Sequence, residues 1–157
     1  MWTEEFVKVL PLLGHRNWIL VVDKAFPLQS APGMTYLNTG EQLPDVLERV
    51  LSDIQKSSHV RPVIYFDTEL TVLDENFCKG IDELRNSIKQ VINEHAEGAE
   101  IQQIPHEKIF SKLDEASKLF NVMVLKTEAV LPYTSVFIQL DCGYWTADQE
   151  AELRKWM

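Results

Sequence analysis

Several side chains of this sequence have the chemistry to bind a polar small molecule and to move protons on it. A histidine gives or takes a proton near neutral pH, a carboxylate accepts hydrogen bonds from hydroxyl groups, and a tyrosine does both. The candidate residues are His15, Asp23, His106, Glu107, Glu128 and Tyr133. Each also has an ordinary structural interpretation. Glu107, for example, would interact favourably with the dipole of a helix from its first turn. The positions of these residues in the fold therefore decide whether they form a site.

Hydrophobic periodicity predicts that strands and helices alternate along the chain. The apolar run at 18–22 is typical of a strand buried on both faces, and apolar residues at helical spacing predict amphipathic helices. The predicted strands are 18–22, 60–66, 99–104, 120–125 and 136–140, and the predicted helices are 3–13, one opening at Pro44, 76–96, 106–119 and 146–156, with 24–42 as a long loop. This alternation predicts an α/β fold, a single domain with a mainly parallel sheet and helices packed on it.

Polar and titratable residues follow the predicted strands. Ligands of such sheets bind beyond the carboxyl ends of the strands. Asp23 follows the first strand, Asp67 and Glu69 the second, residues 105–107 the third and residues 126–128 the fourth. The sequence therefore predicts a small-molecule site at that edge.

Composition excludes several other classes of function. The formal net charge is −9 and no run of lysine or arginine occurs, so we expect no nucleic-acid partner. Two distant cysteines do not form a disulfide framework or a zinc site, and neither a signal peptide nor an apolar run long enough for a membrane is present. With no glycine-rich nucleotide loop and no metal-ligating histidine pair, we expect a soluble cytoplasmic protein without a metal.

Three segments, in order, resemble the ribose pyranase / fucose mutarotase family (RbsD/FucU). Gly14-His15, an apolar strand, Asp23 and Phe26-Pro27 resemble its opening signature. Residues 104–110, with His106-Glu107, resemble its His-Glu segment, and residues 127–138 resemble its Glu and Pro-Tyr-x-Asn segments. The resemblance extends from about residue 3 to residue 144, nearly the whole chain.

The resemblance implies an enzyme that interconverts cyclic forms of a free monosaccharide without a metal or an organic cofactor. His15 matches the family's proton donor, and Asp23 and His106 match its sugar-binding residues, with His106 favouring the ribose branch over the fucose branch. Tyr133, Thr134 and Ser135 match its Tyr-x-Asn segment, and Glu107 and Glu128 would support the site. It also implies ring-shaped homo-oligomers, doubled into decamers, with sites at subunit contacts.

Three features depart from the family pattern. Ser135 stands where the family has an asparagine, and the link from Glu128 to Tyr133 is one residue longer. Residues 145–157 extend past the family's usual end as a predicted helix, which we expect to pack on a neighbouring subunit. The first two departures bear on which sugar is held and whether it is turned over.

The spacing of His15 and Asp23 raises a geometric question. A five-residue strand between them would separate its ends by about 17 Å, too far for both to touch one sugar. Either Gly14-His15 folds back over the sheet or neighbouring subunits complete each site.

Three hypotheses about function remain open. The first is a monosaccharide mutarotase or pyranase acting on a ribose- or fucose-like sugar. The second is a non-catalytic sugar-binding or regulatory protein on the same scaffold, motivated by Ser135 and the longer link. The third is a structural oligomer without a ligand, which the titratable residues at strand ends disfavour.

Overall fold

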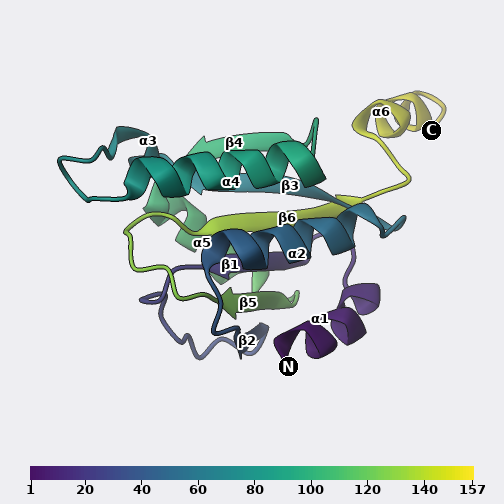
Figure 1. Cartoon of the computed structure of the whole chain (residues 1–157). Coiled ribbons are helices and arrows are strands. Elements are labelled where there is room, and N and C mark those ends of the chain that lie inside the picture. Colours follow the sequence, from purple (N-terminus) through teal and green to yellow (C-terminus); the bar gives the residue numbers. More distant parts are fainter.

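A computed structural model describes residues 1–157 and contains a six-stranded sheet with helices on both faces (Figure 1). The strands are β1 (Trp18–Val22), β2 (Met34–Asn38), β3 (Val60–Asp67), β4 (Glu100–Ile104), β5 (Val122–Lys126) and β6 (Val136–Cys142). The helices are α1 (Trp2–Val9), the 3-10 turn η1 (Leu10–Leu12), α2 (Leu43–Gln55), α3 (Glu69–Val72), α4 (Ile81–His95), α5 (His106–Ala116) and α6 (Ala147–Lys155). The predicted α/β class is confirmed. No helix combines the length and the apolar character that crossing a bilayer requires.

The direction of the strands distinguishes two opposite edges of the sheet, one where most strands end and one where they begin. The strand order is β2-β5-β1-β6-β3-β4, and β6 runs antiparallel to β1 and β3 while every other pairing is parallel. The first five strands therefore all end at one edge, which we call the carboxyl edge, and β6 begins there. The opposite edge, which we call the amino edge, holds the starts of β1 to β5 and the end of β6.

The burial of β1 explains its continuous apolar sequence. All five of its residues are buried. Ile19 and Val21 face a core formed with α1, α2 and α4, whereas Leu20 and Val22 face a second core that includes Ile109 of α5. In Figure 1, α2 and α4 lie on the near face of the sheet and α5 lies behind it. Because both faces are covered, this strand needs apolar side chains at every position.

The predicted loop at 24–42 is wrong in part, because it contains β2. This strand is the outermost strand on one side of the sheet and pairs only with β5. Gly33 precedes it at a point where a Cβ atom would lie against the carbonyl oxygens of Ser117 and Phe120. A short, half-exposed edge strand carries little of the apolar alternation that marks a strand in a sequence.

The predicted helix at 76–96 begins later than expected, at Ile81. Gly80 precedes it with φ +95°, a left-handed conformation that ends the preceding turn and favours glycine. The Glu75 carboxylate accepts hydrogen bonds from the backbone N–H groups of Gly80 and Asp82. The short helix α3 upstream was not predicted.

The predicted C-terminal helix is present as α6 and stands away from the sheet (Figure 1). Thr146 caps it as expected: its hydroxyl accepts a hydrogen bond from the Gln149 N–H, and the Gln149 side chain accepts one from the Thr146 N–H. No residue of α6 is buried. Its stability within one subunit therefore comes from its own capping and side-chain pairs rather than from the core.

Candidate functional site

At the carboxyl edge, His106 lies beside two acidic residues, one at the end of β3 and one just after it. His106 opens α5 directly after β4, and Asp67 ends the neighbouring strand β3. The His106 Nδ1 atom lies 2.8 Å from Asp67 Oδ2, and its backbone N–H donates to the Glu69 carboxylate at 3.0 Å. Ring and backbone are thus both held, which fixes the direction of the imidazole.

The Asp67 carboxyl group is the most perturbed acid of the site. Its side chain is 1% exposed. Burial raises the pKa of Asp67 to about 6; the contact with His106 opposes this shift, and the nearby charges of Glu69 and Asp23 add to it. Its Oδ1 atom has no hydrogen-bond partner. The group therefore changes its charge close to physiological pH.

Asp23 lies at the same edge and is held by Ser135, at the start of β6. The Ser135 hydroxyl donates to Asp23 Oδ1 at 2.7 Å and accepts from the Asp23 backbone N–H at 3.1 Å. Ser135 is 3% exposed. Its hydroxyl is thus engaged in orienting Asp23, whose second carboxylate oxygen has no hydrogen-bond partner within the chain.

Aromatic side chains flank His106. The ring centroid of Tyr133 lies 5.4 Å from that of His106 in an edge-on arrangement, and the centroid of Phe110 lies 4.6 Å away. Phe110 in turn stacks on Phe26, which belongs to the Phe-Pro segment singled out in the sequence. Tyr133 has φ +59°, a left-handed conformation that is uncommon for a tyrosine.

Three other predicted residues make different contacts. The Thr134 hydroxyl is buried and donates to the Leu131 carbonyl at 2.8 Å. Glu128 forms an ion pair with Lys24 at 2.7 Å, and Glu107 is exposed in the first turn of α5. These residues shape the surroundings of the cluster rather than contacting His106 or Asp23.

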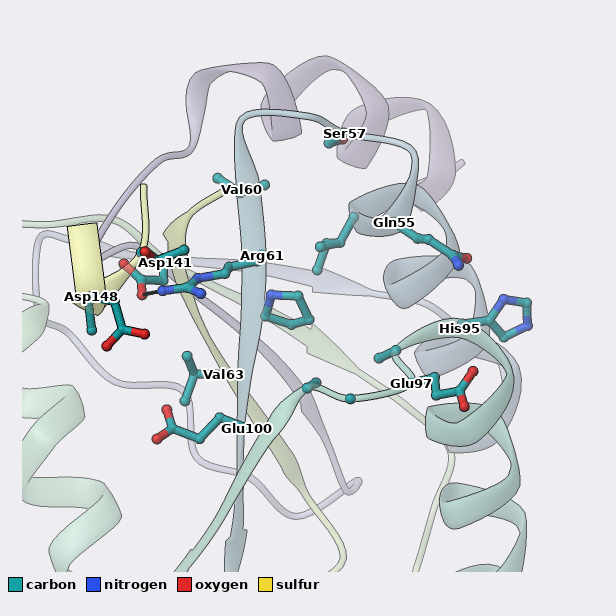
Figure 2. A pocket seen from close by; sticks show the side chains of 17 residues that line it. Gln55, Ser57, Val60, Arg61, Val63, His95, Glu97, Glu100, Asp141 and Asp148 are labelled. Carbon is teal, nitrogen blue, oxygen red and sulfur yellow. Dashed lines mark hydrogen bonds and ion pairs between the residues drawn. The ribbon is translucent and has the colours of Figure 1, made fainter. Parts of the chain in front are cut away.

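His15 lies at the other end of β1, on the amino edge. Its Nδ1 atom lies 2.9 Å from Asp141 Oδ1, near the end of β6, and the Arg61 guanidinium donates to Asp141 Oδ2 at 2.7 Å. The His15 side chain is 57% exposed. Arg61 and Asp141 line an open groove of about 870 Å³ between β3, the end of α2, residues 95–100 and the start of α6. Figure 2 shows both side chains in this groove.

The structure therefore separates the predicted site into two parts. Asp23, His106, Tyr133 and Ser135 gather at the carboxyl edge, whereas His15 precedes the start of β1, a five-residue strand that spans about 17 Å. The loop at Gly14-His15 does not fold back, because the Arg16 N–H bonds to the Leu140 carbonyl at the amino edge.

Sequence reasoning did not assign several residues that contact the predicted ones: Asp67, Glu69, Phe110 and Asp141. It also did not assign Arg61, which contacts Asp141. Asp67 and Glu69 carried a signal, because they follow a predicted strand. Asp141 carried the same kind of signal, because it directly follows the predicted strand 136–140. Its distance of 126 positions from His15 hides their contact in the sequence.

One group of side chains has ligand atoms close enough for a metal ion. Atoms of Glu48, Glu94 and His95 lie within 4.8 Å of one another on α2 and α4. Both carboxylates are exposed, and in Figure 2 the His95 ring points away from Arg61 and Asp141. This group belongs to neither cluster described above.

α/β proteins bind small-molecule ligands beyond the carboxyl ends of their strands, which is where this sheet carries its titratable cluster. Residues 1–142 match the model of the RbsD / FucU transport protein family. The chain therefore belongs to this family, which includes ribose pyranase and fucose mutarotase. Residues 143–157, with α6, lie outside the matched region.

Solved structures show the same fold at low sequence identity. The fucose mutarotase of Streptococcus pneumoniae, in complex with L-fucose, is 19% identical, with a TM-score of 0.62 over 87% of this chain and 91% of that one. Bacillus subtilis RbsD, complexed with D-ribose, is 20% identical, with a TM-score of 0.57 over 87% and 91%. FucU of Bifidobacterium longum is 18% identical, with a TM-score of 0.58 over 88% and 94%. No curated protein matches the chain.

Proposed function

We propose that this protein is a cytoplasmic mutarotase or pyranase that interconverts cyclic forms of a ribose- or fucose-like monosaccharide. The observation that carries the proposal is the pair of histidine–aspartate contacts at the two edges of one sheet, His106–Asp67 and His15–Asp141. Membership of the family and the sugars bound by the solved relatives support the substrate class. The reaction needs no metal and no organic cofactor.

The carboxyl edge supplies the sugar-binding half of the site. Asp23 accepts hydrogen bonds from ring hydroxyls, and His106 offers Nε2 because Nδ1 is engaged by Asp67. Tyr133 and Phe110 present apolar ring surface to the face of a sugar. Ser135 acts through Asp23, and Thr134 fixes the turn that carries Tyr133. Glu107 and Glu128 have supporting roles only.

The amino edge supplies the proton-transfer half. A hemiacetal opens when the proton of the anomeric hydroxyl is removed, the C1 carbonyl forms, and the bond from C1 to the ring oxygen breaks as that oxygen takes a proton. Since His15 uses Nδ1 for Asp141, Nε2 is the atom that exchanges protons with the sugar: the neutral ring takes the anomeric proton on Nε2, and the resulting imidazolium gives it to the ring oxygen. Closure on the other face of C1, or through another hydroxyl, returns the proton and gives the second cyclic form.

One sugar meets both halves when two subunits share the site. The amino edge of one subunit facing the carboxyl edge of the next is a head-to-tail contact, and such contacts close into rings. Large apolar side chains are exposed beside both edges: Leu12 and Tyr144 beside His15 and Asp141, and Leu28 and Val130 beyond the ends of β1 and β5. Burial of these side chains would stabilise a ring-shaped homo-oligomer, or a decamer of two rings.

A second function is supported by Ser135. Its hydroxyl is engaged with Asp23 on both its donor and acceptor sides, so it contributes less to a sugar than a longer amide side chain would. A site that binds a sugar without opening its ring would make the protein a sugar-dependent regulator or carrier.

Exchange NMR on free ribose, fucose and galactose distinguishes the two functions. The mutarotase accelerates magnetisation transfer between the anomers of its sugar, and His15→Ala lowers this rate by roughly 100-fold or more. The variant Asp53→Asn, which alters an ion pair with Arg49 on α2 and removes no contact of either histidine, should exchange the sugar at the wild-type rate. Saturable binding of a sugar without faster exchange would contradict the enzyme and support the regulator.

A further inference from the structure

The Asp141 carboxylate lies between His15 and Arg61 and is bonded on both oxygens. Oδ1 is 2.9 Å from His15 Nδ1 and accepts the Cys142 backbone N–H at 2.8 Å. Oδ2 accepts the Arg61 guanidinium at 2.7 Å. The three residues come from the segment before β1, from β3 and from β6, so only the folded sheet brings them together.

We propose that Asp141 is a positioning residue for His15, and that Arg61 positions Asp141. Together they hold the proton of neutral His15 on Nδ1 and leave Nε2 as the atom that exchanges protons with the sugar. The effect on turnover rests on the proposed function. The effect on the imidazole tautomer does not, because it follows from the contacts within this chain.

The hydrogen-bond inventory requires this tautomer. An ionised carboxylate only accepts hydrogen bonds, so the atom that faces it, His15 Nδ1, has to be the donor. Although burial works against ionisation of Asp141, the hydrogen bonds from Arg61 and from the Cys142 N–H outweigh it and hold the pKa of Asp141 below its usual value. The carboxylate therefore stays an acceptor throughout the physiological range.

Other groups around His15 have separate partners. The guanidinium of Arg16 lies 5.9 Å from the centre of the Phe120 ring. His59 contacts the Leu13 carbonyl through Nε2 at 3.0 Å, which anchors the chain just before Gly14. Asp148 of α6 lies on the Arg61 side of the groove (Figure 2). Asp141 is the carboxylate that is bonded to the His15 ring.

The variant Asp141→Ala tests the proposal because it removes the acceptor that faces His15 Nδ1. No partner then holds the proton of neutral His15 on Nδ1, and Nε2 takes a share of it. We expect the ring 15N shifts of 15N-histidine protein, assigned with His15→Gln, to move from those of a ring protonated on Nδ1 toward those of a ring protonated on Nε2. We expect kcat for sugar exchange to fall roughly 10- to 100-fold with KM nearly unchanged.

The double variant Asp141→Asn/Arg61→Met provides the rescue. Without the Arg61 guanidinium, the amide oxygen accepts from both the Cys142 N–H and His15 Nδ1, which are the two partners of Oδ1 in the wild type, so the Nδ1–H tautomer is kept. We expect the double variant to be faster than Asp141→Ala. Asp53→Asn, which removes a carboxylate from another arginine pair of 2.8 Å, should change neither the His15 shifts nor kcat. Circular dichroism and thermal melting verify that each variant is folded.

The outcomes separate this inference from the proposed function. Unchanged His15 shifts in Asp141→Ala, or a double variant no faster than Asp141→Ala, would overturn the positioning role. If the tautomer shifts in Asp141→Ala and is kept in the double variant while sugar exchange stays at the wild-type rate in both, the positioning role stands and catalysis by His15 is contradicted.

Discussion

The two edges of the sheet carry the same histidine–aspartate contact in opposite surroundings. His15–Asp141 spans 2.9 Å and His106–Asp67 spans 2.8 Å, both through Nδ1. Asp141 is partly exposed and bonded by Arg61, whereas Asp67 is 1% exposed and has two further acids nearby. The pKa of Asp141 is lowered and that of Asp67 is raised to about 6. Equal geometry thus gives a permanent anion at one edge and a titrating acid at the other, because charge and burial differ.

The largest effect is expected when His15 and His106 are removed in different subunits of one assembly, which tests whether the two edges act together. In the proposed ring, one site uses His15 of one subunit and His106 of the next. We expect His15→Ala and His106→Ala each to lose most sugar exchange. Co-expressed at equal amounts, they should recover about a quarter of the wild-type rate, because one contact in four combines both intact residues.

The control for this mixture is the double variant His15→Ala/His106→Ala co-expressed with His15→Ala, since neither parent then carries an intact His15. Exchange NMR on each purified mixture, with native mass spectrometry to verify mixed assembly, gives the result. If mixed assemblies form but their exchange stays at the level of the parents, the two edges do not act on one sugar across subunits.

A second, intermediate effect concerns stability at the carboxyl edge. Because the pKa of Asp67 is raised in the folded protein, the folded state holds its proton over a range in which the unfolded chain has lost it. Stability therefore falls as pH rises from about 4 to about 6, by up to about 3 kcal/mol, and this cost persists at neutral pH. Asp67→Asn carries no such charge, so its free energy of unfolding relative to wild type should rise over the same range. Urea denaturation at several pH values measures this.

The opposite change of stability with pH is expected at the amino edge, which provides the control. The pKa of Asp141 is lowered, so its contribution is present at neutral pH and is lost on acidification. Asp141→Asn should therefore lose stability relative to wild type as pH rises from about 3 toward neutrality. The same pH trend in both variants would contradict the contrast between the two pairs.

The smallest effect is expected from Arg61→Met. Exposed ion pairs contribute about 1 kcal/mol or less and are screened by salt, and both Arg61 and Asp141 are partly exposed. We expect the variant to be less stable than wild type by up to about 1 kcal/mol at low salt, with the difference shrinking at high salt. A larger loss that is insensitive to salt in urea denaturation would mean that Arg61 stabilises the protein by packing.

The sequence predicted more of the carboxyl edge than of the amino edge. Asp23 and His106 follow apolar runs that predict strands, and the carboxyl ends of parallel strands lie at the same edge of a sheet. Asp67 and Glu69 stood in the same kind of position, but their contact with His106 depends on β3 and β4 being neighbours. The edge strand β2 was missed because its half-exposed residues lack a strong apolar pattern.

The sequence by itself determined the α/β class, the buried central strand and the kinds of side chain available for chemistry, because apolar periodicity and strand ends are local properties. Only the tertiary structure decided which of them meet. The antiparallel β6 carries Ser135 to Asp23 at its start and Asp141 to His15 at its end. The spacing of His15 and Asp23 already raised the question of their separation, but strand direction and neighbour order are set by packing of the whole sheet. Only the structure therefore decided that Gly14-His15 does not fold back and that Asp141 is the partner of His15.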